Sequence, residues 1–300
     1  MNFAVPAAAL QRVGEIANEI RMTFHGGFRG KVILVEGSDD KKAFEKFFPR
    51  RDLARFIDAH GWESVLQVMN KLVNDPFLGN VIPVLDSDYH HISGTDFREC
   101  RPIFTDKRDL EIELLTDEGL ALLINEFSSP AKIAAFLGIG ASDDPTRTAA
   151  FKERLFAEAG IIGAVRAMSA VERRKHCFGE VGWSKIVHKK TGRIDRGSLA
   201  AHLRGKCIAN KDLTVDEIDR YVLRCGEMQR HRELGPASYC RGKDVLELAG
   251  HLFRSTCGSS KCSDVTSENM QRILRSSFGE NNFKMTKFGC LLAAMVDGGQ

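Results

Sequence analysis

Acidic side chains follow two strongly apolar segments of the chain. Glu36 comes directly after the run 32–35, and Asp86 and Asp88 come directly after the run 81–85. In an open parallel sheet, ligands bind beyond the carboxyl ends of the strands, so these three carboxylates are predicted to meet at one edge. Carboxylates at such separations repel one another, and a divalent cation relieves that repulsion. A small set of hard oxygen ligands suits Mg²⁺, with Mn²⁺ as an alternative.

A purely structural role explains Glu36, Asp86 and Asp88 less well than metal binding does. An acid after a strand is often a helix cap or a first-turn residue, and this role suits Asp39 and Asp40 as well as metal binding does. The run that begins at Asp86 lacks the glycine and the final glutamate of an EF-hand loop. The glycine-rich segment 26–31 precedes a strand instead of following one, so it is not a phosphate-binding loop of an ATPase.

Strand and helix patterns alternate through the first half of the chain. Short apolar runs predict strands, and apolar residues at helical spacing predict the helices between them. Such alternation indicates βαβ units, so we predict an α/β fold with a parallel sheet flanked by helices. The predicted strands are 32–35, 54–58, 81–85 and 102–105, and the predicted helices include 5–23 and about 109–125.

Charge divides the chain into two halves. Residues 1–150 carry 17 Lys and Arg against 23 Asp and Glu, a net −6, whereas residues 151–300 carry 26 against 17, a net +9. A basic half suggests contact with a polyanion. The longest apolar stretch, Cys290 to Val296, is far too short to span a bilayer, and no secretory signal is visible. We therefore expect a cytoplasmic protein with eight reduced cysteines.

The second half is predicted to be mainly helical. Thr214 and Glu217 form a capping-box pattern. Phe178 and Trp183, beside the basic stretch, are candidates for base stacking, although core packing is the commoner role of such rings. A zinc site at Cys257 and Cys262 has no second close pair to support it. The predicted helices are about 146–158, 161–178, 197–209, 214–229, 243–255 and 266–277.

The two acidic motifs together resemble a known domain. Val35-Glu36-Gly37-x-x-Asp40, followed about fifty residues later by Leu85-Asp86-x-Asp88, is similar to the Toprim domain of topoisomerases, bacterial primases and OLD nucleases. The resemblance covers about residues 28–127. It implies a Toprim domain at 28–127 after an N-terminal helix at 1–27, and leaves a mainly helical basic domain at 128–300.

A closer resemblance extends further along the chain. The segment 104–111, with Thr105-Asp106 and Asp109-Leu110-Glu111, looks like a TD-x-x-D-L-E element of a Toprim family related to the OLD nucleases. Arg241-Gly242-Lys243-Asp244 looks like a Gly-His-Asp element of that family, with Lys243 in place of His. Some members are nuclease effectors of the PARIS anti-phage system. The resemblance implies a Mg²⁺-dependent endonuclease that cleaves host tRNA, forms a homodimer and is held inactive by an ABC-type ATPase partner.

The motif positions carry roles over to this chain. Glu36 would be a metal ligand or general base, Asp86 and Asp88 would bind Mg²⁺, and Glu111 would complete a second metal position. Asp40 is a further candidate metal ligand, and Glu113 is an alternative to Glu111 because the segment 110–115 aligns in two ways. Two metal ions in such a site can clamp the attacking and leaving oxygens of a phosphodiester. The candidate nucleic-acid contacts are Lys107, Arg108, Arg173, Arg174, Lys175, Lys189, Lys190, Arg193 and Lys243.

Two other functions stay open at this stage. An OLD-type DNA nuclease would use the same carboxylates on duplex DNA. A Toprim-like binding subunit without catalysis would keep the fold and lose metal binding. Topoisomerase chemistry would need a nucleophilic tyrosine in a further module, and none of the three tyrosines has such a setting.

Overall fold

The computed structural model forms two compact units. The first consists of Met1–Ser87, Thr95–Asp106 and Phe278–Gln300, and the second of Asp88–Gly94 and Lys107–Ser277. Compared with the predicted domains, this division places residues 107–127 in the second unit and joins the N-terminal helix and residues 278–300 to the unit that carries the sheet. The structure describes residues 7–90, 94, 97, 100–140, 143–172, 174, 176, 178, 181–232, 235–259 and 264–298.

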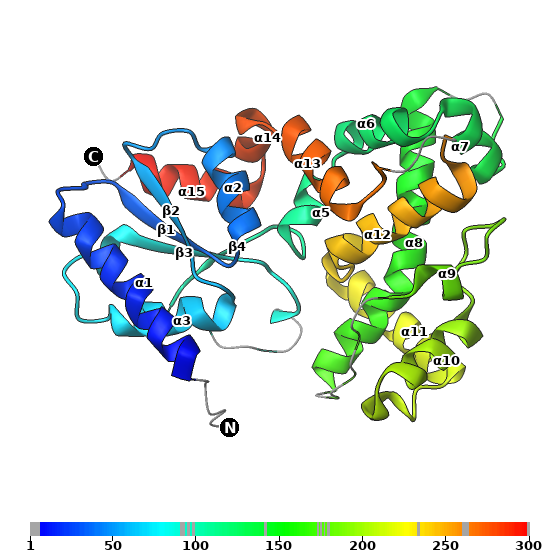
Figure 1. The fold of residues 1–300 in the computed structure, drawn as a ribbon, viewed down its shortest axis with the longest axis horizontal. Helices are drawn as coiled ribbons and strands as arrows, with labels where there is room; N and C mark the ends of the chain where they lie inside the picture. Colours follow the sequence, from blue (N-terminus) through cyan, green and yellow to red (C-terminus); the bar gives the residue numbers. More distant parts are fainter. Residues whose placement is uncertain are drawn as a thin grey trace. The chain divides into compact units, whose positions relative to one another are not determined.

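The first unit is built on a parallel four-stranded sheet (Figure 1). The sheet order is β2-β1-β3-β4, and every pairing is parallel. Its strands are Lys31–Val35 (β1), Ala54–Asp58 (β2), Val81–Leu85 (β3) and Ile103–Phe104 (β4). The expected α/β fold with helices flanking a parallel sheet is therefore confirmed.

Two helices cover one face of this sheet. Helices α1 (Ala7–His25) and α3 (Trp62–Lys71) lie side by side below it in Figure 1. Alternate strand residues point to this face: Val32 and Leu34 of β1 join an apolar core with Val13, Ile16 and Ile20 of α1 and Val65 and Val68 of α3. Burial of β-branched and leucine side chains on both faces explains why β1 is apolar from Val32 to Val35.

Aromatic side chains fill the opposite face. Helix α2 (Ser38–Phe47) places Phe44 on Phe56 of β2, with ring centroids 5.8 Å apart. The C-terminal helices α14 (Glu280–Met285) and α15 (Lys287–Asp297) return to this layer, where Phe283 and Phe288 meet Phe44 edge to face. Offset and edge-to-face rings of this kind add stability beyond their buried area.

A carboxylate just after β4 fixes the returning chain. Asp106 accepts hydrogen bonds from the backbone N–H groups of Lys287 at 2.6 Å and Phe288 at 3.1 Å. These are the first amides of α15, which have no acceptor within the helix. Asp106 therefore ties the last helix to the sheet, a contact between residues 181 positions apart.

The second unit is helical. Its longest element, α8, packs against α11, α6 and α12. The helices are Leu110–Leu114 (α5), Asp117–Phe127 (α6), Pro130–Leu137 (α7), Asp144–Val171 (α8), Trp183–Ile186 (α9), Arg196–Lys206 (α10), Val215–Arg232 (α11), Gly242–Leu252 (α12) and Ser267–Ser277 (α13). A π-helical turn, Phe253–Cys257, extends α12.

Two helix predictions were wrong in their extent. Helix α8 runs unbroken through the predicted gap at 159–160, because Gly160 and Gly163 give room to a neighbouring loop instead of ending the helix. A Cβ atom at Gly163 would lie 2.7 Å from the carbonyl oxygen of Tyr239. The predicted helix 109–125 is divided into α5 and α6. Thr214 does accept a hydrogen bond from the Glu217 amide at 3.1 Å, as the capping pattern predicts.

No single helix in the described part of the chain is both long enough and apolar enough to cross a membrane. Helices α6 and α7 satisfy the length and hydropathy criteria when taken as a pair, and they meet at an angle of 105°.

Candidate functional site

The strand order reverses between β1 and β3. The chain passes from β1 through α2 to β2 on one side, and through α3 to β3 on the other side of β1. Helices α2 and α3, which make these two connections, lie on opposite faces of the sheet (Figure 1). In open α/β sheets this reversal point, at the carboxyl ends of the strands, is where ligands bind.

Glu36 and Asp86 lie at this point. Each directly follows one of the two central strands, and the Glu36 carboxylate accepts a hydrogen bond from the Asp86 backbone amide at 2.8 Å. Both residues are partly exposed. The sequence-based prediction that the acids after 32–35 and 81–85 meet at one sheet edge is therefore confirmed for Glu36 and Asp86.

The neighbouring strand end adds polar groups to the same edge. Thr105, which follows β4, accepts a hydrogen bond from the Ser87 amide at 2.9 Å through its hydroxyl, and its own amide donates to Leu85 at 3.0 Å. The Ser87 hydroxyl also donates to the Thr105 carbonyl. Thr105 was not a predicted site residue, because the strand was predicted to include it and only acids that follow a strand were selected.

Asp40 belongs to the first turn of α2. A Cβ atom at Gly37 would lie 3.2 Å from an Asp40 carboxylate oxygen, so Asp40 lies against the start of its own helix. This position fits a first-turn role for Asp40, in which a carboxylate stabilises the N-terminal end of a helix.

Asp88 and Arg108 form an ion pair in the second unit. The Arg108 guanidinium lies 2.7 Å from Asp88 and 2.5 Å from Asp109, and its carbon lies 4.5 Å above the centre of the Tyr89 ring. Arg108 is only 6% exposed. Although burial opposes its charge, Tyr89, Asp109 and Asp88 raise the pKa of Arg108 overall. Arg108 was predicted to contact phosphate, but it is enclosed by protein groups and presents little surface to a nucleic acid.

Asp109 links this cluster to the start of two helices. It caps α5 by accepting a hydrogen bond from the Ile112 amide at 3.1 Å, and it accepts another from the Gly242 amide at 2.8 Å, at the start of α12. A Cβ atom at Gly242 would meet Glu111 at 2.3 Å and Asp109 at 2.6 Å. Within the segment 241–244, Gly242 is therefore required by its close packing against Glu111 and Asp109.

Glu111 and Glu113 differ in their surroundings. Glu113 is 3% exposed and accepts a hydrogen bond from the Lys107 amide at 2.5 Å, so it holds the preceding loop. Glu111 is partly exposed and accepts a hydrogen bond from Gln271 at 3.2 Å. Of the two alternatives for the late acid, Glu111 is the more accessible.

The basic residues that were predicted to contact nucleic acid differ in their surroundings: some are exposed to solvent and others lie beside acids. Lys189, Lys190 and Arg193 are exposed on a turn closed by a bridge between Val187 and Ile194. Arg174 is bound to Glu172 and Glu217, and Lys243 lies 4.0 Å from Glu247. Arg173 and Lys175 lie outside the described residues.

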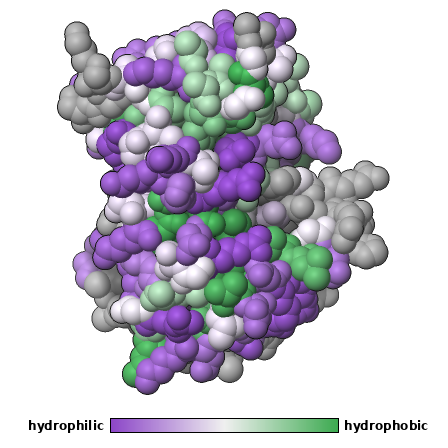
Figure 2. Space-filling model, turned by 90° about the vertical axis from the view of Figure 1, so that its right-hand side faces the viewer, coloured by the Kyte–Doolittle hydropathy of each residue, from purple (hydrophilic) through white to green (hydrophobic). Residues whose placement is uncertain are grey.

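The molecular face in Figure 2 is mostly hydrophilic, with hydrophobic residues in separate patches.

Phe178 and Trp183 are both buried, at 8% and 6% exposure. Arg166 lies over the Phe178 ring, 4.6 Å from its centre, and the Trp183 indole donates a hydrogen bond to Glu247 at 3.1 Å. Of the two roles considered for these rings, base stacking and core packing, this burial supports core packing.

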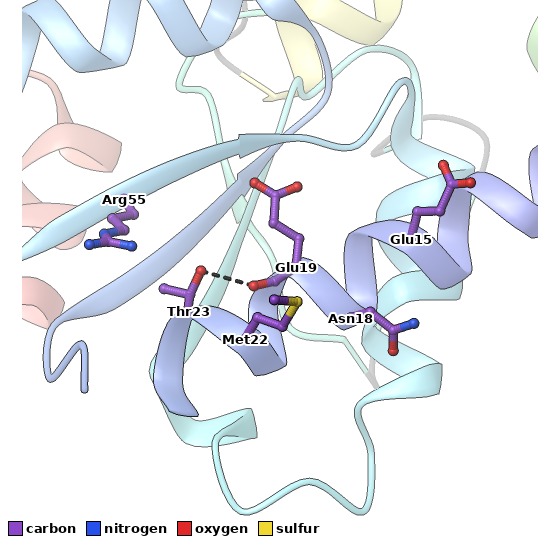
Figure 3. Close-up of a pocket in the computed structure, with 6 residues that line it drawn as sticks. All are labelled: Glu15, Asn18, Glu19, Met22, Thr23 and Arg55. Atoms are coloured by element: carbon purple, nitrogen blue, oxygen red, sulfur yellow. Dashed lines mark hydrogen bonds between the residues drawn. The ribbon is translucent and has the colours of Figure 1, made fainter. Parts of the chain in front are cut away.

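A groove in the first unit contains none of the predicted site residues. It has a volume of about 530 Å³ and is bordered by five residues of α1 and by Arg55 of β2 (Figure 3). A second groove of about 360 Å³ adjoins it along β2. Both lie along the outer strand of the sheet, whereas Glu36 and Asp86 lie at the ends of the inner strands.

Within the part of the chain that the structure describes, no group of three or more His, Cys, Asp or Glu side chains is arranged to hold a metal ion. Glu36 and Asp86 belong to the first unit, and Asp88, Glu111 and Glu113 to the second. No protein-family model and no curated protein matches the chain.

Proposed function

We propose that this protein is a Mg²⁺-dependent nuclease of Toprim type that hydrolyses phosphodiester bonds. The observation that carries the proposal is the pairing of Glu36 with Asp86 where the strand order reverses. Two acids at the ends of adjacent parallel strands match the position at which such sheets bind ligands. Their carboxylate oxygens are the donors that Mg²⁺ prefers.

Glu36 and Asp86 would hold the ion in this proposal. When bound, Mg²⁺ stabilises negative charge on the phosphate that is attacked. The amide of Asp86 orients the Glu36 carboxylate, and the hydrogen bonds between Ser87 and Thr105 fix the loop that carries Asp86. The roles predicted for Asp88 and Glu111 remain predictions.

The substrate that we propose is RNA, and specifically host tRNA in an anti-phage response. The exposed turn with Lys189, Lys190 and Arg193 supports contact with a polyanion. The family resemblance supports a defence role, a homodimer and an ABC-type ATPase partner that restrains the nuclease.

The test compares isosteric variants of the two acids. Glu36→Gln and Asp86→Asn should each lower cleavage of a tRNA pool by at least about 10²-fold, because each loses the charge that holds the ion. Glu15→Gln, which changes an exposed acid of α1, is the matched control and should cleave normally. Parallel digestion of duplex DNA separates the RNA nuclease from the OLD-type alternative. Full cleavage by Glu36→Gln would refute the proposed site.

A second candidate function, a Toprim-like binding subunit without catalysis, is favoured by one observation. Asp88 is already paired with the Arg108 guanidinium at 2.7 Å, which gives this carboxylate a positive partner other than a metal ion. Calorimetric titration with Mg²⁺ and Mn²⁺ distinguishes the two functions. Metal binding that disappears in Glu36→Gln supports the nuclease, and its absence in the wild-type protein supports the binding subunit.

A further inference from the structure

The loop that follows β2 brings a histidine to the proposed site. In the parallel register Asp58 of β2 pairs with Val35 of β1, the residue before Glu36. The ladder continues beyond the strands, because the Ala59 amide donates to Val35 at 2.9 Å and the Gly61 amide donates to Glu36 at 2.7 Å. His60 lies between these two hydrogen bonds, so its backbone is fixed beside Glu36.

Asp58 holds His60 in place. One Asp58 carboxylate oxygen accepts the His60 backbone N–H at 2.8 Å, and the other lies 3.4 Å from the His60 Nδ1 atom. Asp58 is 14% exposed at its side chain and His60 is 50% exposed. The Asp58 carboxylate beside Nδ1 restrains the ring, and Nε2 is the nitrogen that is left for a ligand.

The backbone of this loop is strained. His60 has a φ of +59°, and the following Gly61 has a φ of +112°. A residue with a side chain rarely adopts the left-handed region, and where one does at a ligand-binding edge the strain often serves function. The local cost is offset by the hydrogen bonds of Asp58 and Gly61, which hold the His60 backbone at the carboxyl edge of the sheet.

We infer that His60 is a catalytic residue of the proposed nuclease, in which its protonated Nε2 atom donates a proton to the leaving oxygen. This role rests on the proposed function. Water attacks phosphorus and releases one proton to solvent, the bond between phosphorus and the leaving oxygen breaks, and the departing alkoxide takes the proton of His60. His60 then takes up a proton from solvent, so water supplies every atom that is added to the products and no other reactant is needed. Asp58 acts as a positioning residue through the ring.

The substitution that tests this role is His60→Gly, because glycine adopts a φ of +59° without strain. Loss of a general acid should lower the rate of tRNA cleavage in Mg²⁺ by about 10²- to 10⁴-fold. Added imidazole should then restore part of the rate in proportion to its concentration, because it replaces the missing proton donor. Asp58→Asn should lower the rate by a smaller factor and should not respond to imidazole.

The matched control is His25→Asn. His25 is an exposed residue at the end of α1, next to the start of β1 and therefore at the opposite edge of the sheet. This variant should cleave at the wild-type rate, with no response to imidazole. Circular dichroism and Mg²⁺ titration should show that His60→Gly folds and binds metal normally.

The outcomes separate the two proposals. If Glu36→Gln is inactive while His60→Gly keeps the wild-type rate, or falls without any rescue by imidazole, the role of His60 is overturned and the nuclease site stands. If the wild-type chain does not cleave, or if Glu36→Gln cleaves fully, the proposed function fails and the role of His60 fails with it.

Discussion

The two groups of acids in this protein are held in contrasting ways. In the first unit, the Glu36 carboxylate accepts a hydrogen bond from a backbone amide at the end of a neighbouring strand. In the second unit, Asp88 and Asp109 share the buried guanidinium of Arg108. A backbone amide orients a carboxylate without supplying a counter-charge, whereas an arginine supplies both.

This difference predicts different uses of the same residue type. A carboxylate fixed by an amide dipole retains its charge toward an incoming cation, as a metal ligand must. A carboxylate paired with a buried arginine is part of the packing, and removal of its partner leaves a charge with poor solvation. The sequence presents Glu36 and Asp88 alike as acids that follow a strand, but the partners of their carboxylates assign them different physical roles.

The largest effect on stability is expected from Arg108→Met. This change leaves Asp109, 4% exposed, and the adjacent Asp88 without their cation. It should lower the free energy of unfolding by about 3–5 kcal/mol, measured by urea denaturation. Glu36→Gln should change the same quantity by less than about 1 kcal/mol, since an amide oxygen can still accept from Asp86. Equal losses in the two variants would contradict the contrast between the sites.

A smaller loss is expected from Gly242→Ala, which tests how tightly the arginine cluster is packed. The new methyl group would press on Glu111 and Asp109, so the free energy of unfolding should fall by about 1–3 kcal/mol. The control is Gly226→Ala in α11, where the added carbon would meet no atom within 4 Å apart from its chain neighbours and the nearby backbone of its own helix. That change should stabilise the protein by about 0.5–1 kcal/mol, because alanine favours a helix over glycine. If Gly242→Ala left the free energy of unfolding unchanged, the packing around Glu111 and Asp109 would be able to relax.

Local patterns predicted the centre of the fold. The segment 54–58 was predicted as a strand and is β2, and the apolar runs before Glu36 and Asp86 are the two central strands. Strand-end position alone was enough to bring those two acids together. The same patterns could not predict the return of α15 to the sheet, because it depends on Asp106 and amides 181 residues away.

The partners of charged side chains were the least predictable feature. Arg108 follows Lys107 in a loop-like sequence, and nothing in that sequence indicates that its side chain is enclosed by Asp88, Asp109 and Tyr89. Gly160 likewise has the pattern of a helix break, whereas its lack of a side chain admits Tyr239. Such contacts join distant segments, so their energy has no signature in local spacing.

The exposed basic turn of the second unit differs from the Arg108 cluster, because its charges face solvent. If Lys189, Lys190 and Arg193 contact phosphates, changing all three to Gln should weaken RNA binding by about tenfold at physiological salt. The slope of log affinity against log salt should fall by about 2–3, since fewer counterions are released. Binding is measured with Glu36→Gln to prevent cleavage. The control is Arg272→Gln, whose exposed charge lies 3.4 Å from Glu268. An unchanged slope would remove this turn from the RNA contacts.

The smallest effect on stability is expected at His202. Its imidazole ring, like the Glu36 carboxylate, accepts a hydrogen bond from a backbone amide. The His202 Nε2 atom accepts a hydrogen bond from the Gly182 amide at 3.2 Å, which requires the neutral ring. Burial, together with the nearby Lys206 and Lys185, lowers the pKa of His202. As the pH falls through about 6.5, the unfolded chain takes up a proton that the folded chain resists, so the folded state loses stability.

The His202→Gln protein keeps an acceptor for the Gly182 amide but has no proton to gain at this position. The stability of the wild-type protein relative to this variant should therefore be greatest above pH 7 and should decline toward pH 5, in urea midpoints measured across that range. Removal of one neighbouring charge by Lys185→Met should make the decline shallower, because one cause of the lowered pKa is gone. A relative stability that rises toward acid would mean that the folded protein favours the charged ring, and that the amide does not hold His202 in its neutral form.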